Sequence, residues 1–160
     1  MIYVVGRGRV GSALTAALPE AIAVAGRGFS GISALTADDV VVLSVPDAAV
    51  AQCAAALAET PAVVLHCAGA VPLSALGQGS RGVLYPMVSF RSSVAWSQVP
   101  VFAESTDVRA AQAVRDLAQQ QVEWRRPDGA AAVVEQVARE AELPAARAQA
   151  LWALQGVGAL

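Results

Sequence analysis

Short hydrophobic runs alternate with helical patterns along most of the chain. Met1–Val5 and Ala21–Ala25 are brief apolar runs that each lead into glycine, which is typical of buried strands. Between them, Arg9–Leu18 has helical character and is closed by Pro19. The start of the chain therefore predicts a strand, a helix and a second strand.

The same alternation continues to Trp124 and sets the predicted fold class. Asp39–Val45 is continuous and rich in β-branched residues, as expected for a strand at the centre of a parallel sheet covered on both faces. Strands that alternate with helices predict an α/β fold, a doubly wound and mostly parallel Rossmann sheet with right-handed crossovers. The further predicted strands are Ala62–Cys67, Gly82–Pro86, Val99–Ser105 and Val122–Trp124, and the further predicted helices are Ala48–Glu59 and Val108–Gln119.

The pattern changes after Arg126. Val133, Val137 and Ala141 recur every four residues and mark one face of a helix, and Pro144 fits the first turn of a second helix. Two such helices are too small for a core of their own, so we expect them to form a homodimer contact. The sequence therefore predicts a Rossmann dinucleotide-binding domain over residues 1–126 and a two-helix C-terminal appendage over residues 127–160.

Composition and charge narrow the possible partners and the location. The chain has 160 residues, of which 56% are hydrophobic and 15% charged, and its formal charge is −2. This balance gives no electrostatic reason to expect nucleic acid or an anionic membrane as a partner. No apolar run has the length of a membrane span, and the N-terminus lacks a signal-peptide pattern, which predicts a cytoplasmic protein.

The reactive residue types are few. All 11 basic residues are arginines, which excludes a mechanism that needs a lysine ammonium. His66 is the single histidine, so no metal site built on histidines is expected. Cys53 and Cys67 lack a metal-ligand spacing and are expected to be reduced and buried.

A glycine-rich motif joins the first strand to the first helix. VVGRGRVGSAL, Val4–Leu14, holds Gly6, Gly8 and Gly11 in the spacing G-x-G-x-x-G. In a dinucleotide-binding loop the first glycine permits a tight turn, the second lets the backbone approach the pyrophosphate, and the third lets helix and strand pack closely. A turn that simply needs glycine is the alternative interpretation. The position between a predicted strand and a predicted helix favours nucleotide binding.

The end of the second predicted strand bears on which dinucleotide binds. NAD sites usually carry an acidic residue there for the ribose hydroxyls, but this chain has Gly26, Arg27 and Gly28 and no acid until Asp38. Arg27 can pair with a 2′-phosphate, with Arg7 in the nearby loop, and a solvated surface arginine is the alternative. NADP is therefore favoured over NAD.

Three further segments end predicted strands on the side where an open sheet binds its ligand. SVPD, Ser44–Asp47, has a small residue and a proline that let the backbone lie against the nicotinamide ribose, or it is a plain strand stop. His66 either exchanges a proton near neutral pH or is buried and organises its loop. Tyr85 either donates a hydrogen bond to a substrate carbonyl or is a half-buried aromatic with a satisfied hydroxyl.

Taken together, these stretches resemble a known group of proteins. VVGRGRVGSAL, VVLSVPDAAV, VLHCAGAVPLSAL, GVLYPMVSF and VPVFAES occur in the order and spacing of an uncharacterised Rossmann-like family of NADP-binding oxidoreductases. That family carries a helical C-terminal domain like that of 6-phosphogluconate dehydrogenase, and its relatives include pyrroline-5-carboxylate reductase, prephenate dehydrogenase and the deazaflavin-dependent NADP reductases. The resemblance covers residues 1–124, and beside that family this chain is expected to have a shortened C-terminus.

The resemblance implies roles for particular residues and a general class of reaction. The leading hypothesis is an NADP-dependent oxidoreductase that moves hydride to or from a small carbonyl or imine, with His66 and then Tyr85 as candidate proton donors and with a pocket completed across a homodimer. A second hypothesis is an NADP-binding sensor or degenerate enzyme without catalysis, and a third is a structural dimer without a cofactor. The resemblance implies that Gly6, Gly8, Arg9, Val10 and Gly11 hold the pyrophosphate, that Arg27 meets the 2′-phosphate, that Val45 and Pro46 lie beside the cofactor ribose, and that His66, Ala68 and Gly69 border the nicotinamide.

Overall fold

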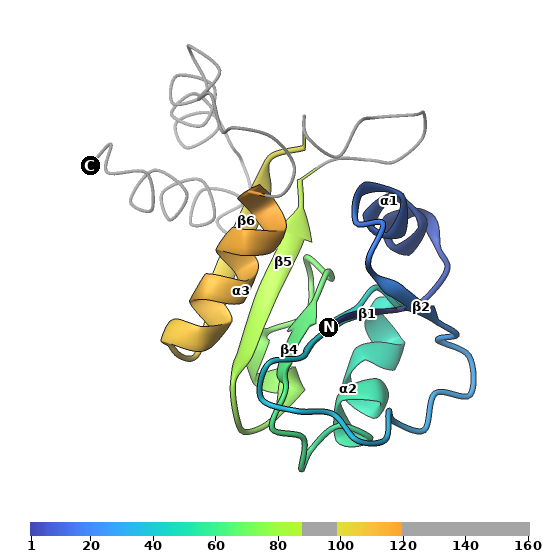
Figure 1. Cartoon of the computed structure of the whole chain (residues 1–160), viewed down its shortest axis with the longest axis vertical. Coiled ribbons are helices and arrows are strands. Elements are labelled where there is room, and N and C mark those ends of the chain that lie inside the picture. Colours follow the sequence, from blue (N-terminus) through green and yellow to red (C-terminus); the bar gives the residue numbers. More distant parts are fainter. Residues whose placement is uncertain (88–98, 120–160) are drawn as a thin grey trace. The chain divides into compact units, whose positions relative to one another are not determined.

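The computed structural model describes residues 1–87 and 99–119, which all belong to one compact unit, Met1–Val122 (Figure 1). The strands form a single sheet in the order β2-β1-β3-β4-β5-β6. Three α-helices and one short 3₁₀ helix, η1, lie within these residues. The bounds are β1 Ile2–Val5, α1 Arg9–Ala17, β2 Ile22–Val24, β3 Val40–Leu43, α2 Asp47–Ala55, β4 Val63–His66, η1 Leu73–Leu76, β5 Arg81–Pro86, β6 Val101–Ser105 and α3 Val108–Gln119.

The sheet is parallel from β2 to β5, and β6 runs antiparallel to β5. The predicted fold class, a doubly wound and mostly parallel Rossmann-like sheet, is confirmed. Because β2 pairs on one side of β1 and β3 on the other, the chain reverses its direction of winding between β1 and β3. The carboxyl ends of β1 and β3 therefore meet at a topological switch point, where open α/β sheets bind their ligands.

The core consists of two layers, one on each face of the sheet. Side chains of α1 and α3, among them Leu14 and Val114, pack with Val42 and Leu65 in one buried cluster. Side chains of α2 and η1 pack with Val41 and Val64 in the other cluster. Neighbouring residues of one strand thus face opposite layers, which is why these strands are hydrophobic throughout instead of alternating with polar residues.

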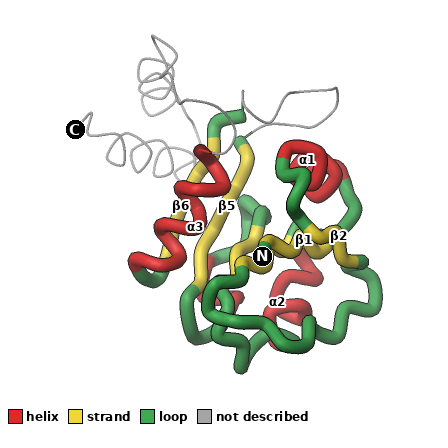
Figure 2. The backbone as a smooth tube through the Cα atoms, in the orientation of Figure 1, coloured by secondary structure: helices red, strands yellow, loops and turns green. Residues whose placement is uncertain are grey.

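The connection between β2 and β3 contains no helix. Residues 25–39 form turns and extended segments that run around the outside of the sheet, and Figure 2 shows them as a long loop. A turn closes directly after β2, where the backbone N–H of Phe29 donates to the carbonyl of Gly26 at 3.3 Å. The edge of the sheet at β2 is therefore bordered by a loop that carries Arg27.

Most predicted elements are observed with small differences at their ends. The helix Val108–Gln119 has the predicted bounds, whereas the helix predicted over Ala48–Glu59 ends at Ala55. Beyond Ala55 the backbone tightens, because the N–H of Leu57 donates to the carbonyl of Ala54, three residues back, at 2.9 Å. The predicted strand Val122–Trp124, the boundary near Arg126 and the appendage over 127–160 with its homodimer contact lie outside the described residues.

The structure also bears on the two cysteines and on the question of a membrane span. Cys53 and Cys67 are free and buried, as predicted. Burial raises the pKa of the Cys67 thiol to about 12, so this thiol stays protonated at neutral pH. No helix of residues 1–87 and 99–119 is long and apolar enough to cross a membrane.

Candidate functional site

The carboxyl ends of β1, β2 and β3 come together at the switch point. A Cβ atom added to Gly26, two residues after β2, would lie 2.8 Å from Cγ1 of Val45 and 3.3 Å from Cα of Gly6. Gly6 follows β1, and Val45 lies two residues after β3. Three neighbouring strand ends therefore touch one another, and the glycine-rich loop lies in the middle of them.

Gly6 makes the sharp turn out of β1. Its φ is +111°, a conformation that side chains disfavour, and an added Cβ would lie 2.5 Å from the carbonyl oxygen of Ser44. Its backbone N–H donates to the carbonyl of Val24 at 2.9 Å. Both the conformation and the close packing require glycine here.

Gly11 brings α1 close to the end of β3. A Cβ added to this buried residue would collide with the carbonyl oxygen of Gly6 and would lie 2.5 Å from Oγ of Ser44. Only a glycine allows the first turn of α1 to pack against the loop at this distance. Gly11 therefore has the close-packing role that the sequence motif predicts.

Gly8 differs from both of its neighbours in the motif. Its φ of −73° and ψ of −172° are ordinary extended values that any residue adopts, and no atom lies within 4 Å of an added Cβ. Neither the conformation nor the packing of the described protein requires glycine at this position. The open space beside Gly8 is the feature expected where a ligand approaches the backbone.

The N-terminus of α1 is free of its own anionic group. No side chain caps α1, and no acidic residue lies in its first turn. By contrast, α2 has Asp47 in its first turn, and α3 is preceded by Asp107, whose carboxylate accepts a hydrogen bond from the N–H of Ala110 at 2.8 Å. The first backbone N–H groups of α1, together with the helix dipole, therefore present positive partial charge toward the space beside Gly8.

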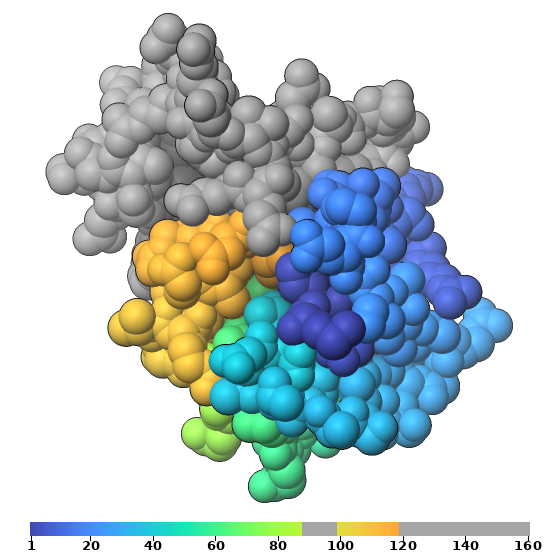
Figure 3. Space-filling model, in the orientation of Figure 1, coloured from blue at the N-terminus to red at the C-terminus, as the bar shows by residue number. Residues whose placement is uncertain are grey.

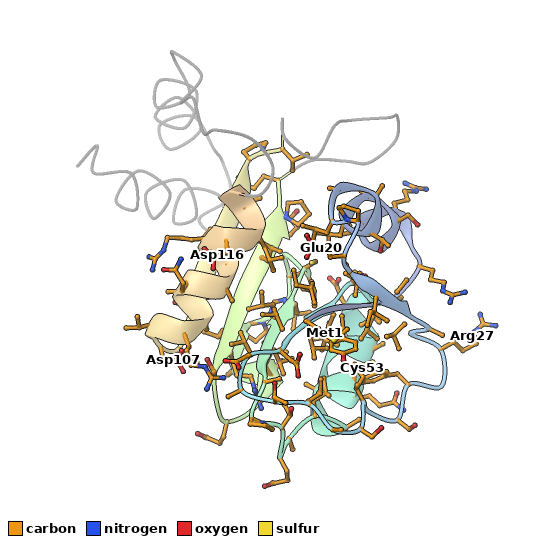
Figure 4. All side chains as sticks on the ribbon, viewed as in Figure 1. Met1, Glu20, Arg27, Cys53, Asp107 and Asp116 are labelled. Atoms are coloured by element: carbon orange, nitrogen blue, oxygen red, sulfur yellow. The ribbon has the colours of Figure 1, made fainter. Side chains whose placement is uncertain are left out.

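Two arginines flank this helix end in sequence, and a third lies in the loop after β2. Arg7 and Arg9 are exposed on either side of Gly8, and Arg27 extends away from the body of the protein into solvent (Figure 4). Among the described residues, the one ion pair within 4.0 Å joins the N-terminus to Asp39, so no described carboxylate neutralises these three guanidinium groups. The loop is therefore a cationic surface around uncapped backbone amides.

Ser44 fastens β3 to the glycine-rich loop. Its hydroxyl donates to the carbonyl of Val5 at 2.9 Å, and the carbonyl of Gly6 lies 3.2 Å from the same oxygen. Its backbone N–H also donates to the carbonyl of Val5, at 2.8 Å. The sequence motif placed Ser44, Val45 and Pro46 beside a ribose, and the structure places Ser44 half-buried against the loop, Val45 half-buried and Pro46 exposed.

His66 ends β4 and is completely buried, with 0% of its surface exposed. Its Nδ1 accepts a hydrogen bond from the backbone N–H of Ala68 at 3.2 Å, and Nε2 has no hydrogen-bond partner in the described part of the chain. Burial lowers the pKa of His66, so the ring is neutral at pH 7, and the bond from Ala68 leaves the proton on Nε2. This geometry favours the interpretation in which His66 organises its loop.

Tyr85 lies beside the loop that follows His66. A Cβ added to Gly69 would lie 2.5 Å from Cζ of Tyr85 and 2.6 Å from Cε2, so the phenol ring covers this glycine directly. Ala68 is buried, whereas Gly69 is exposed and Tyr85 is half-buried. The structure thus brings Gly69 and Tyr85 together, and of the two candidate proton donors only Tyr85 keeps exposed surface.

Two contributions to the site were not anticipated from the sequence. Gly26 packs on Gly6 and Val45, and the hydroxyl of Ser44 is directed to loop carbonyls. A glycine directly after a short strand was a usable signal for the first, whereas nothing in the sequence shows where a serine hydroxyl donates. In residues 1–87 and 99–119, no group of three or more His, Cys, Asp or Glu side chains is placed to hold a metal ion.

The fold and the loop define the class of architecture, a Rossmann-like domain with a glycine-rich turn at its switch point. A solved structure from Bacteroides fragilis, described as a "putative NADP oxidoreductase", is similar to this chain, with a TM-score of 0.59 and 21% sequence identity. The alignment covers 75% of this chain and 56% of that one, so this chain spans little more than half of that protein's length. At this identity the similarity establishes the shared fold. No protein-family model matches the sequence, and no curated protein matches it.

Proposed function

We propose that this protein binds NADP at the glycine-rich loop and acts as an oxidoreductase on a small carbonyl or imine substrate. The observation that carries the proposal is Gly8, a glycine that neither backbone conformation nor packing requires, beside an uncapped helix N-terminus. A pyrophosphate supplies the missing reason, because it needs both close backbone approach and free amides. This protein shares its fold with the Bacteroides fragilis protein described as a "putative NADP oxidoreductase", which is consistent with this function.

Each group near the loop has a defined part in holding the cofactor. The amides at the start of α1 donate to the pyrophosphate, and Arg7 and Arg9 neutralise its charge. Arg27 pairs with the 2′-phosphate, because the end of β2 offers a guanidinium where an NAD site offers a carboxylate. Val45 and Pro46 lie along the nicotinamide ribose, with Ala68 and Gly69 at the nicotinamide.

The bound dinucleotide supplies the hydride chemistry, and the residues of this chain bind, orient and exchange a proton. Tyr85 is the better placed proton donor, since its ring covers Gly69 and part of its surface is exposed. His66 contributes by fixing the loop at Ala68, and its own role as a donor stays a prediction.

Replacing Gly8 by serine tests whether glycine is needed at this position for cofactor binding or for the stability of the free protein. Serine is a preferred residue at the start of a helix, so Gly8→Ser is expected to keep or raise the stability of the free protein by a few tenths of a kcal/mol, about 0.3. The added side chain occupies the space beside the backbone, so the affinity for NADPH is expected to fall at least about tenfold, the value of one charge-assisted hydrogen bond. Calorimetric titration and thermal unfolding measure the two effects.

Gly6→Ala is the control for a glycine that the free protein itself requires. Gly6→Ala places a side chain at a φ of +111° against Ser44 and should lower the stability of the free protein, unlike Gly8→Ser. Unchanged NADPH affinity in Gly8→Ser would contradict a pyrophosphate site at this loop.

The burial of His66 favours a second candidate, an NADP-binding module without turnover. A wholly buried neutral imidazole does not reach a substrate, and of the two candidate proton donors Tyr85 then remains as the exposed one. NADPH oxidation measured against carbonyl and imine compounds, repeated with Tyr85→Phe and His66→Asn, distinguishes the two. Binding of NADPH without oxidation of any compound in the panel would select the non-catalytic module.

A further inference from the structure

We infer that Ser44 is a positioning residue for the glycine-rich loop, and that its hydroxyl donates to the loop and sets its conformation instead of donating to the cofactor. This inference rests on the proposed NADP site for its effect on binding, and on geometry alone for its effect on the loop. It assigns Ser44 a different role from the ribose contact expected from the sequence motif.

The hydroxyl of Ser44 is fully directed to the loop. A serine hydroxyl has a single proton to donate, and here the carbonyl of Val5 at 2.9 Å and the carbonyl of Gly6 at 3.2 Å share it. No proton remains for donation to a phosphate oxygen or to any other cofactor oxygen. The hydrogen bond instead crosses the switch point, from the end of β3 to the end of β1.

The same oxygen is enclosed by the two structural glycines of the motif. A Cβ added to Gly6 would lie 3.0 Å from Oγ of Ser44, and one added to Gly11 would lie 2.5 Å from it. Ser44 therefore contacts both the turn out of β1 and the first turn of α1. The side chain fills the space that the absence of side chains at Gly6 and Gly11 creates.

These contacts determine where the free amides of α1 point. The carbonyl of Gly6 lies against Gly11, so a shift of the Gly6 peptide moves the first turn of α1. Without the hydroxyl, the turn at Gly6 keeps its bond to Val24 but loses its second attachment across the switch point. The geometry of the anion site, rather than the stability of the sheet, is the property that Ser44 controls.

The test compares Ser44→Ala with Thr15→Ala in the full chain. Thr15 is the matched control, because its hydroxyl donates to the carbonyl of Gly11 at 2.8 Å within α1 and makes no attachment to β3. Hydrogen exchange is measured in both variants without ligand at the amides of Gly6 and Ser12, which donate to the carbonyls of Val24 and Gly8, with the amides of β4 as the internal reference. We expect exchange at Gly6 and Ser12 to rise about three- to tenfold in Ser44→Ala, the loss of one hydrogen bond, and to stay unchanged in Thr15→Ala.

Measurements of ligand binding then distinguish a role of Ser44 in positioning the loop from a general loss of stability in Ser44→Ala. NADPH contains a pyrophosphate and adenosine 2′-monophosphate does not, so Ser44→Ala should weaken NADPH by about three- to tenfold and leave adenosine 2′-monophosphate unchanged. Unchanged exchange at Gly6 and Ser12, or an equal rise at β4, would overturn the inference. If the wild-type protein binds neither compound, the proposed NADP site is wrong, and the exchange result still decides the role of Ser44.

Discussion

Asp39 accepts three hydrogen bonds just before β3, at the amino ends of the strands, and the candidate site lies at their carboxyl ends. One oxygen accepts from the N-terminal ammonium at 2.8 Å, and the other accepts from the backbone N–H and the hydroxyl of Thr36 at 2.7 and 2.9 Å. Figure 3 shows the first residues, in dark blue, at the surface of the protein beside later segments. These bonds, with the ammonium first, lower the pKa of Asp39 from 3.8 to about 2.

The lowered pKa predicts a loss of stability in acid. A carboxylate whose pKa is lower in the folded state stabilises the fold above its unfolded pKa, and this contribution disappears as the pH falls from 3.8 to about 2. Asp39→Asn is expected to lower the melting temperature at pH 6 and to reduce the further drop between pH 5 and pH 2. Asp38→Asn is the control, since Asp38 is exposed and takes part in none of these bonds. An identical acid profile in wild type and Asp39→Asn would contradict this account.

At the level of single residues, the sequence predicts the local conformation better than it predicts hydrogen-bond partners or burial. The motif identifies Gly6, Gly8 and Gly11 correctly as a turn between a strand and a helix, because the end of a strand, the turn and the start of a helix lie within a few residues of one another. The partner of Ser44 is not encoded locally, since Val5 is 39 positions away in the chain. The burial of His66 likewise depends on elements that come from other parts of the sequence.

Arg81, the first residue of β5, donates hydrogen bonds to η1, to the segment after α2 and to the residue before β4. This arginine is only 1% exposed, and its Nε donates to the carbonyl of Leu76 at 3.2 Å. Its terminal nitrogens donate to the carbonyls of Leu57 and Ala58, which follow α2, and of Ala62, each at 3.4 Å. The guanidinium therefore satisfies carbonyls just beyond the C-terminus of α2, where a positive charge is favourable.

Removing this guanidinium should destabilise the domain. Arg81→Met keeps much of the volume but leaves several buried carbonyls without a donor, and we expect the free energy of unfolding to fall by at least about 2 kcal/mol. Arg81→Lys should recover only part of this loss, because one ammonium cannot reach carbonyls on three separate segments. Urea unfolding measures both variants. A change below about 0.5 kcal/mol in Arg81→Met, the range of ordinary surface substitutions, would show that these bonds do not stabilise the fold.

The observed bounds of a helix agree with the predicted bounds where the pattern that sets them is local. They differ where residues distant in the sequence make contacts at the end of the helix. The helix α3 has its predicted bounds, since its amphipathic pattern and the cap at Asp107 lie within a few residues of each other. The end of α2 differs from the prediction, and the carbonyls beyond it bond to Arg81, more than 20 positions later. The antiparallel direction of β6 was not predicted either, because an apolar run shows that a strand exists but not its direction.

At the scale of the whole domain, the proposed cofactor would span the sheet from its edge strand β2 across the switch point to β5. Arg27 follows the edge strand β2, which pairs with β1 alone, and Tyr85 lies in β5 on the other side of the switch point. A ligand that binds the folded state and spans these strands stabilises it by mass action, by about 2.7 kcal/mol at 100 times its dissociation constant. For a chain of this size that corresponds to a rise in melting temperature of about 5–10 °C.

This linkage allows the NADP preference to be tested without a known substrate. NADPH is expected to raise the melting temperature more than NADH at equal concentration, because only the 2′-phosphate engages Arg27. Arg27→Ala should remove that difference by lowering the NADPH effect to the NADH level, whereas Arg115→Ala, which removes an exposed arginine from α3, should leave it intact. Since the two cofactors differ only in the 2′-phosphate, the residual shift in Arg27→Ala reports the contacts that both cofactors share, including those of the pyrophosphate with the glycine-rich loop. Equal shifts for NADPH and NADH in the wild type would instead show that Arg27 does not select the cofactor.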